Sequence, residues 1–438
     1  MGLNLTSLLR AVDQAPIRRV TGRVAEVTGS LVEAELPGVA LGTLCRVGTD
    51  GTAEVVGFRG SRALLQPLEA GSGLAWGDRV RALAVAATAP VGEGLLGRVI
   101  CAMGRPLDGL GALRVARRRR INGVPPDALK RRPVDRLLKT GVRAIDGLMP
   151  LAHGQRMMIA SGSGVGKSTL LGMLARFVET DAVVVNLVGE RGRELNEFLE
   201  DALGKEGRSR SVVVVATSDQ SPALQLRSTS LATTIAEDLR DQGKDVLLLV
   251  DSLTRLALAR RQIGLAAGEP PTTRGFTPSV FSLMPPLLER AGCGEGPGSI
   301  TGIYTVLVEA DDENDPIADW VRGIVDGHIV LSRKLARQGH YPAIDVLSSL
   351  SRVADRVTTP DQRANMSRYR ALLSTWRENE DLVKLGAYKR GAMPEVDEAI
   401  ARRVALEAFT CQEPRVRALD IDAALRAATS GPPQALNK

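Results

Sequence analysis

Residues 161–168 have the types and the order of a phosphate-binding loop. Their sequence is SGSGVGKS, and they stand between an apolar run and a segment with helical spacing. Glycines at 162, 164 and 166 let backbone N–H groups turn toward phosphate oxygens at the N-terminus of a helix. We therefore predict that Lys167 binds the β- and γ-phosphates of ATP and that the Ser168 hydroxyl binds Mg²⁺.

The loop departs from the general pattern GxxxxGK[ST] at one position, because Ser161 stands where the pattern has glycine. The three later glycines retain the turn, and the helix is expected to begin near Thr169. The predicted nucleotide-binding set from this segment is Gly162, Ser163, Gly164, Val165, Gly166, Lys167, Ser168 and Thr169.

An acidic residue follows a second apolar run, KDVLLLVD at residues 244–251. A carboxylate at the end of a buried parallel strand lies at the C-terminal edge of the sheet, beside the phosphate loop. Asp251 is therefore predicted to support Mg²⁺ and its waters. The pattern is weak by itself, but its place roughly 80 residues after the loop favours this role.

A third apolar run ends in VGERGRE at residues 188–194. A carboxylate here can polarise the attacking water, which distinguishes a hydrolase from a nucleotide-binding module, and Glu190 is the candidate. The alternative is a cluster of charges that satisfy one another at the start of a helix, and the spacing does not decide between the two. Hydrolysis also needs a cation on the γ-phosphate, often an arginine of another subunit, but arginines are too abundant here for composition to select one.

Strand-like apolar runs alternate with helical segments through the middle of the chain, which is typical of a mostly parallel sheet covered on both faces. The runs cover residues 157–160, 182–188, 212–216, 246–250, 303–308 and 328–331. We predict an α/β nucleotide-binding domain over residues 89–358.

The two ends of the chain have different patterns. Residues 20–87 show short alternating runs broken by glycines, which predict an N-terminal β-barrel domain over residues 1–88. Beyond residue 359 apolar residues recur at helical spacing, which predicts a C-terminal helical domain over residues 359–438. The residues that indicate its helices are Met366, Tyr369, Leu372, Leu373, Trp376, Ile400, Val404 and Phe409.

Composition excludes several classes of protein. The chain has 438 residues, of which 44% are hydrophobic, and no run approaches the roughly 20 apolar residues of a membrane span. Its four scattered cysteines favour a reducing compartment. The net charge of +7 lies largely in two clusters, at residues 117–120 and 130–132, which we interpret as a solvated linker. Because no aromatic residues are interleaved there to stack bases, nucleic acid is not an expected partner.

Taken together, the motifs resemble the ATPases of type III protein export, the flagellar and injectisome secretion motors, which are related to the F- and V-type ATPase subunits. The resemblance runs from about residue 20 to residue 410. The matching segments are GLLGRV (94–99), GRPLDG (104–109), TGVRAIDG (140–147), GSGVGKS (162–168), GERGRE (189–194), DSLTR (251–255), GEPPTTRGFTPS (268–279), DGHIVLSR (326–333) and HYPAID (340–345). RENEDL (377–382) and GAYKRG (386–391) resemble the export branch in particular.

The resemblance implies a RecA-like core and a role for each matched residue. Lys167, Glu190 and Arg352 would be catalytic, with Arg352 as an arginine finger that enters the neighbouring subunit's site. Asp251 would be the second metal-supporting residue, and Tyr341 would pack on the adenine ring. For Tyr341, the alternative without the family is a core residue beside a proline.

The resemblance also implies a setting. The protein would be a cytoplasmic homohexamer, peripheral at the cytoplasmic face of the inner membrane. Its partners would be stator and central-stalk proteins, export chaperone–substrate complexes and the export gate. The loop at residues 268–278 would line the central channel or be an ordinary surface connection.

Three functions remain as hypotheses. The first is an export ATPase, flagellar or injectisome, that releases chaperones and unfolds substrates. The second is a catalytic subunit of an F- or V-type synthase, which would need a partner chain. The third is a hexameric RNA translocase, against which the predicted barrel offers only Phe58 and Trp76 to stack bases.

Overall fold

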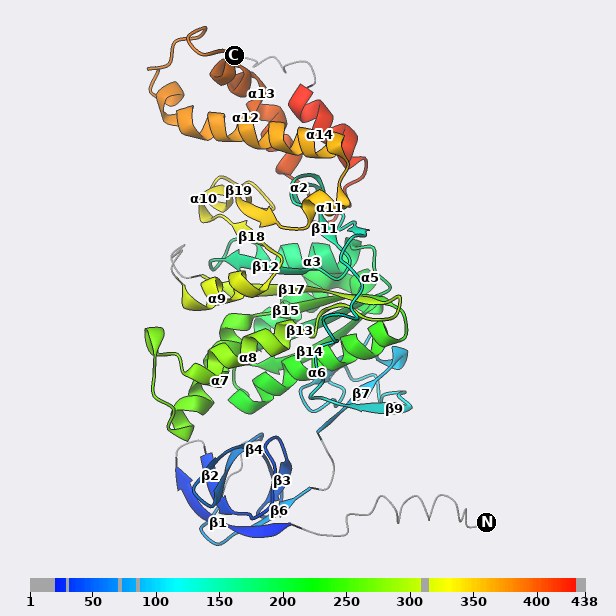
Figure 1. Ribbon diagram of the computed structural model, residues 1–438, viewed down its shortest axis with the longest axis vertical. Coiled ribbons are helices and arrows are strands. Elements are labelled where there is room, and N and C mark those ends of the chain that lie inside the picture. The colour runs from blue at the N-terminus through cyan, green and yellow to red at the C-terminus, as the bar shows by residue number, and fades with distance from the viewer. Residues whose placement is uncertain (1–19, 29–30, 70–72, 84–86, 309–314, 431–438) are drawn as a thin grey trace, which may run out of the picture.

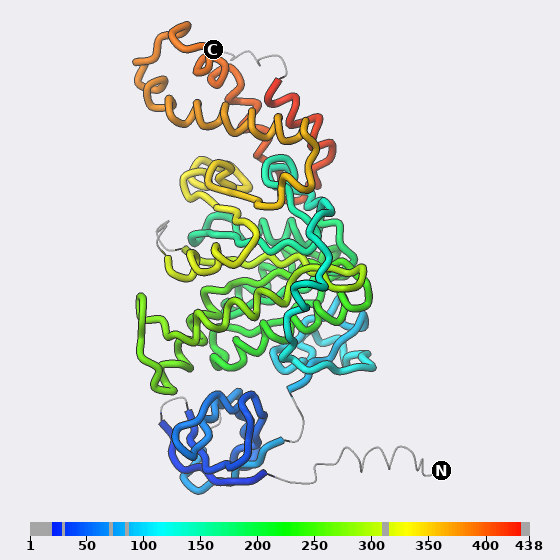
Figure 2. Tube along the Cα trace, in the orientation of Figure 1, coloured from blue at the N-terminus to red at the C-terminus, as the bar shows by residue number. Residues whose placement is uncertain are grey.

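The structure is a computed structural model, and it describes residues 20–28, 31–69, 73–83, 87–308 and 315–430. Three parts follow one another along the long axis of the molecule (Figure 1): a β-barrel at one end, a sheet covered by helices in the middle, and a group of helices at the other end. The trace in Figure 2 passes through them in chain order. In the described part of the chain, every helix is too short or too polar to cross a membrane.

The barrel forms because its strands alternate between inward apolar and outward polar side chains. Its closed order is β1-β2-β5-β4-β3-β6, and its interior holds small and branched side chains such as Val24, Ala34, Val55 and Val80. The strands are β1 (Thr21–Thr28), β2 (Leu31–Glu35), β3 (Leu44–Val47), β4 (Gly51–Arg59), β5 (Arg62–Pro67) and β6 (Arg79–Ala82). The predicted β-barrel is confirmed.

The central sheet has the strand order β19-β18-β12-β17-β15-β13-β14-β8, with β16 (Gly292–Cys293) paired to β17. Six of these strands are the predicted apolar runs, and they pair in parallel, as expected for a sheet buried on both faces. They are β12 (Arg156–Ser161), β13 (Ala182–Glu190), β14 (Ser211–Thr217), β15 (Asp245–Asp251), β17 (Ser299–Leu307) and β18 (Gly327–Leu331).

The two outer strands of this sheet were not predicted. β8 (Val99–Cys101) has only three residues and lies in a segment rich in glycine, proline and arginine. β19 (Ile344–Ser351) pairs antiparallel to β18 and alternates between buried and exposed residues, so it lacks a continuous apolar run. Edge position explains both omissions, because an edge strand needs neither great length nor apolar side chains on both faces.

Helices cover both faces of the sheet and divide the core in two. One cluster of buried side chains includes α3 (Lys167–Phe177) and the C-terminal helices, and the other includes the long helix α6 (Pro222–Asp241). The remaining elements of this region are β7 (Thr88–Val91), β9 (Arg117–Arg120), β10 (Leu137–Leu138), α2 (Arg143–Leu148), β11 (Leu151–Ala152), α4 (Gly192–Glu197), a π-helix (Phe198–Leu203), α5 (Gly204–Ser209), α7 (Leu253–Ala267), α8 (Pro278–Leu288), α9 (Pro316–Ile324), α10 (Arg333–Arg337) and α11 (Ala354–Val357).

Three helices form the C-terminal part: α12 (Pro360–Lys384), α13 (Pro394–Thr410) and α14 (Ile421–Ser430). The predicted face of α12 is buried, with Tyr369, Leu372, Leu373 and Trp376 in the core. On α13 Phe409 is buried, whereas Val404 is 39% exposed and does not belong to the packed face. Near the top of Figure 1, α2 lies against these helices although it precedes them by more than 200 residues, since it contacts α12, α13 and α14.

Most side chains of the two basic clusters are exposed, but the clusters are not a linker. The first is the strand β9, which pairs with β7, and Arg117 and Arg119 form ion pairs with Asp238 (3.0 Å) and Asp241 (2.6 Å) of α6. In the second, Arg131 bonds to Glu289 at 2.9 Å. The interpretation as a linker was wrong, because the carboxylates that pair with these arginines lie far away in the sequence.

Candidate active site

The phosphate-binding loop connects β12 to α3. Gly164 and Gly166 have φ angles of 75° and 87°, in the left-handed region that only glycine adopts without strain. Val165 between them is buried and anchors the loop, whereas Ser168 and Thr169 in the first turn of α3 are exposed. The helix begins at Lys167, two residues before the predicted start, because the left-handed Gly166 already turns the chain into it.

Lys167, Glu190 and Asp251, the three charged residues predicted for the site, lie together. The ammonium of Lys167 bonds to Oδ1 of Asp251, and it lies 3.6 Å from Oε1 of Glu190. Asp251 and Glu190 are the last residues of the neighbouring strands β15 and β13, and β17 lies between β15 and the strand that leads into the loop. The parallel order of the sheet therefore places all three at one edge.

A residue of the neighbouring strand β17 holds Asp251 in place. Asp251 is 3% exposed, and its Oδ1 accepts a hydrogen bond of 2.7 Å from the hydroxyl of Thr305 on β17. The exposed Ser168 follows Lys167 in the chain, so the loop carries a hydroxyl one residue after the lysine that contacts this fixed carboxylate. Oxygen ligands of this kind, with phosphate oxygens and waters, suit Mg²⁺.

Glu190 is a buried carboxyl group among several charges. It is 8% exposed, and its Oε1 accepts a hydrogen bond of 3.3 Å from Nε of Arg255. Burial, a hydrogen bond with Glu194 and the charge of Asp251 raise its pKa to about 7, against the opposing effects of Lys167 and Arg255. A carboxyl group with a pKa near neutrality suits proton transfer at working pH.

Two arginines at the site were not among the predicted residues. Arg255 follows Asp251 by four residues and reaches Glu190 from α7. Arg333 begins α10 and lies against the loop, since a Cβ added to Gly162 would be 2.6 Å from its Nη2 atom. Both residues end motifs that the sequence shows, DSLTR and DGHIVLSR, and their place shortly after an apolar strand is the signal in the sequence.

Tyr341 lies at the phosphate loop and not in the core. The side chain is 42% exposed, and a Cβ added to Gly166 would be 3.4 Å from its Cδ1 atom. The alternative of a core residue is therefore wrong. An exposed aromatic ring beside the loop presents an apolar surface to whatever the loop binds.

Arg352 lies at the opposite edge of the sheet from the phosphate loop. Ser351 at the end of β19 pairs with Gly327 at the start of β18, and β18 runs parallel to β12, whose far end leads into the loop. The exposed guanidinium of Arg352 donates to the carbonyl oxygens of Val325 (3.2 Å) and Arg322 (3.3 Å). The fold thus does not bring Arg352 to the site of its own chain.

The loop at residues 268–278 is irregular, as its composition indicates. It connects α7 to α8 and contains one short 3₁₀ turn, Thr273–Gly275, in which Arg274 has a φ of 51°. Thr277 at its end is buried, and Oε2 of Glu269 accepts a 3.1 Å hydrogen bond from the backbone of Ser279. The hydrogen bond to Ser279 and the burial of Thr277 therefore fix the conformation of the loop.

Comparison with known proteins gives matches in all three parts of the chain. Residues 141–351 match the nucleotide-binding domain of the ATP synthase alpha/beta family, and residues 17–84 match the beta-barrel domain of the same family. Residues 358–427 match the T3SS EscN ATPase C-terminal domain.

Relatives match over nearly the whole chain. The sequence is 48% identical to the flagellum-specific ATP synthase of Bacillus subtilis over 400 residues, which covers 90% of this chain and 91% of the relative. It is 49% identical to the type 3 secretion system ATPase of Xanthomonas euvesicatoria over 412 residues, which covers 93% of each.

Solved structures show the same fold. The assembled ATPase EscN of the enteropathogenic E. coli type III secretion system matches with a TM-score of 0.89 at 42% identity, over 93% of this chain and 100% of that chain. Its complex with the central stalk EscO matches with a TM-score of 0.87 at 41% identity, with the same coverage. The predicted fold class, with a barrel, a P-loop core and C-terminal helices, is confirmed.

The raised pKa of Glu190 predicts a pH-dependent change in stability. Because the fold raises this pKa from 4.5 to about 7, it favours the neutral carboxyl group, and that contribution is present below pH 4.5 and lost as the pH rises through 7. We expect Glu190→Gln to raise the free energy of unfolding by about 2 kcal/mol at pH 8 and by much less at pH 5, in urea titrations. Glu197→Gln, at an exposed ion pair with Arg193, should change neither value, and an equal gain at both pH values for Glu190→Gln would contradict the shift.

Proposed function

Since the chain belongs to the family that contains the flagellum-specific ATP synthases and the type 3 secretion system ATPases, we propose that it hydrolyses ATP to power type III protein export, as a flagellum-specific ATPase. The observation that carries the proposal is the meeting of Lys167, Glu190 and Asp251 at one sheet edge, beside the exposed Ser168. Hydrolysis would release chaperones and unfold export substrates at the gate.

In this proposal the loop residues 162–169 bind the phosphates. Backbone N–H groups around Gly164 and Gly166 would donate to the phosphate oxygens, and Lys167 would exchange part of its contact with Asp251 for the β- and γ-phosphates. Ser168 and Asp251 would hold Mg²⁺, which neutralises developing charge on the phosphates. The residues fit this ion, because a hydroxyl and a fixed carboxylate are what the position needs beside phosphate and water ligands.

Glu190 would orient the attacking water and accept its proton. Its raised pKa supports this role, because a carboxylate that is not strongly acidic is a better proton acceptor. Arg255 at 3.3 Å holds the carboxyl group in place. Tyr341 would pack on the adenine, since its ring is exposed beside Gly166.

The active unit would be a homohexamer in which Arg352 stabilises charge on the γ-phosphate of the neighbouring site. Its position at the opposite edge of the sheet from the chain's own loop supports a role between subunits. Since one chain carries Lys167, Glu190 and Arg352, every site around such a ring would be equivalent.

Other partners follow from the same proposal. EscN has been solved in complex with its central stalk EscO, which supports a stalk partner here, with the loop at residues 268–278 lining the channel. Stator proteins, chaperone–substrate complexes and the export gate at the cytoplasmic face of the inner membrane complete the proposed setting.

Substitution of Glu190 tests the chemistry. Glu190→Gln should retain ATP binding and lose about 10²-fold or more in turnover, because the amide cannot accept the proton. Lys167→Ala is the contrasting variant and should lose both ATP binding and turnover. Turnover is measured as steady-state phosphate release, and binding with a fluorescent nucleotide. Normal turnover in Glu190→Gln would reduce the residue to a structural role.

Mixed assemblies test the shared site. Arg352→Ala and Glu190→Gln should each be nearly inactive alone, but mixing them creates interfaces with an intact Glu190 on one side and an intact Arg352 on the other. We expect the mixture to recover a measurable part of the wild-type rate at concentrations where mass photometry detects hexamers. A mixture as inactive as its components would count against Arg352 acting between subunits.

Complementation tests the biological assignment. Expression of the chain in a bacterium that lacks its flagellum-specific ATPase should restore filament export and swimming, and the Glu190→Gln chain should not. The parallel experiment uses a strain that lacks its type 3 secretion ATPase, because identity to both groups of relatives is similar. Restoration of secretion alone, without swimming, would replace the flagellar assignment with the injectisome.

A further inference from the structure

Where α13 ends, the chain returns to the core and meets the segment that carries Tyr341. Gln412 lies at this point and is 7% exposed, although it is polar. Its backbone N–H donates a 2.9 Å hydrogen bond to the carbonyl oxygen of Tyr341. The residue before it, Cys411, lies with its Sγ 3.3 Å from Nδ1 of His340. Two consecutive residues of the C-terminal part thus pair with Tyr341 and with the residue that precedes it.

The side-chain amide of Gln412 fixes this contact in place. Its Oε1 accepts a 2.8 Å hydrogen bond from the backbone N–H of Arg143, and its Nε2 donates to the carbonyl oxygens of Gly141 (2.8 Å) and Val416 (2.7 Å). A buried amide with all these bonds has one orientation, because reversing it would set donors against donors. Gln412 therefore ties three segments together: the start of α2, the Tyr341 segment and its own chain.

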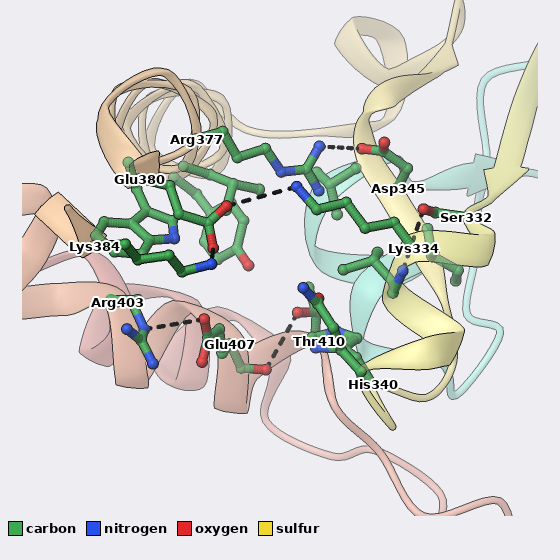
Figure 3. A pocket seen from close by; sticks show the side chains of 17 residues that line it. Ser332, Lys334, His340, Asp345, Arg377, Glu380, Lys384, Arg403, Glu407 and Thr410 are labelled. Atoms are coloured by element: carbon green, nitrogen blue, oxygen red, sulfur yellow. Dashed lines mark hydrogen bonds and ion pairs between the residues drawn. The ribbon is translucent and has the colours of Figure 1, made fainter. Parts of the chain in front are cut away.

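The part of the junction that faces α10 and β19 is looser. A cavity of about 380 Å³ separates α10 and β19 from α12 and α13 (Figure 3). Ion pairs span it, with Arg377 bonded to Asp345 at 2.7 Å and Lys334 3.6 Å from Glu380. Such partly exposed pairs contribute little to stability, whereas a fully bonded buried amide is costly to disrupt. Gln412 is therefore a firmer tie between the two parts than the ion pairs across the cavity.

Tyr341 is thus held from one side and presented to the site on the other. Its carbonyl oxygen receives the Gln412 bond, and its exposed ring lies beside Gly166 of the phosphate loop. A shift of residues 411–412 would move the Tyr341 backbone and, with it, the ring. Helix α13 ends at Thr410, directly before this contact, so the position of α13 and the position of the ring are coupled.

We propose that Gln412 is a positioning residue that holds the Tyr341 ring where adenine packs and couples the C-terminal helices to nucleotide binding. The proposal rests on the adenine contact of Tyr341 in the proposed function. Gln412 touches no reacting atom, so it acts on the affinity for ATP and not on the chemical step. Substitution of Gln412 is therefore expected to raise KM and to leave kcat nearly unchanged, because a misplaced ring weakens the binding of substrate and transition state alike.

The test compares steady-state ATPase kinetics of single and double variants of the full chain. Gln412→Ala should raise KM for ATP about tenfold and change kcat by less than about twofold. Gln412→Glu, which keeps the size but cannot donate to Gly141 and Val416, should act in the same direction and carries the test if the alanine variant does not fold. The double variant Gln412→Ala/Tyr341→Ala should have the same KM as Tyr341→Ala alone, because Gln412 acts through the Tyr341 ring.

Arg370→Ala is the matched control. Arg370 also joins the C-terminal helices to the core, through bonds to the carbonyl oxygens of Val346 (2.8 Å), Leu148 (3.1 Å) and Ser349 (3.1 Å), but it does not contact Tyr341. Its KM should stay at the wild-type value. An unchanged KM in Gln412→Ala, an equal rise in Arg370→Ala, or additive effects in the double variant would each overturn the inference. A wild-type KM in Tyr341→Ala would locate the failure in the adenine contact of the proposed function instead.

Discussion

The ammonium group of Lys167 lies between the carboxyl groups of Asp251 and Glu190, and the geometry of the site depends on this arrangement. Both acids are buried at the ends of strands, where an unpaired charge is costly. The cation of the phosphate loop offsets part of that cost, Thr305 orients Asp251, and Arg255 orients Glu190. Even so, Glu190 keeps a raised pKa, so burial prevails over its two cationic neighbours.

This arrangement also explains how the site can respond to a nucleotide. In the proposed function phosphate oxygens would compete with the carboxylates for Lys167, and the ammonium is already placed at the loop where they would bind. A carboxyl group that loses part of its cation becomes a stronger proton acceptor. The same displacement would thus prepare Glu190 for the proposed role at the moment when substrate is present.

The direction of the sheet has consequences beyond a single chain. Parallel strands place the phosphate loop, Glu190 and Asp251 at one edge, and the antiparallel strand β19 carries Arg352 back to the other. One chain therefore presents the loop and the two acids at one edge and Arg352 at the opposite edge. Gln412 adds a further constraint, because it bonds to the backbone of Tyr341, whose ring lies beside the loop, and follows directly after the C-terminal helix α13.

The sequence by itself determined the chemistry and most of the framework. The loop SGSGVGKS, the apolar strands that end in Glu190 and Asp251, and the alternating pattern of the barrel depend on local residue types, and each was predicted in the right place. Local pattern also gave the buried face of α12, since its spacing follows one helix. Edge strands escaped prediction, because β8 is short and β19 is apolar on one face only.

Only the tertiary structure decided which distant residues meet. The pairing of Arg117 with Asp238, the approach of Arg333 to Gly162 and the bonds of Gln412 to Gly141 and Arg143 join residues that no local pattern connects. The pKa of Glu190 likewise depends on burial and on charges from other strands and helices. Residue type states what a side chain can do, whereas the packing of strands and helices determines its partners and its solvent, and these set its charge and position.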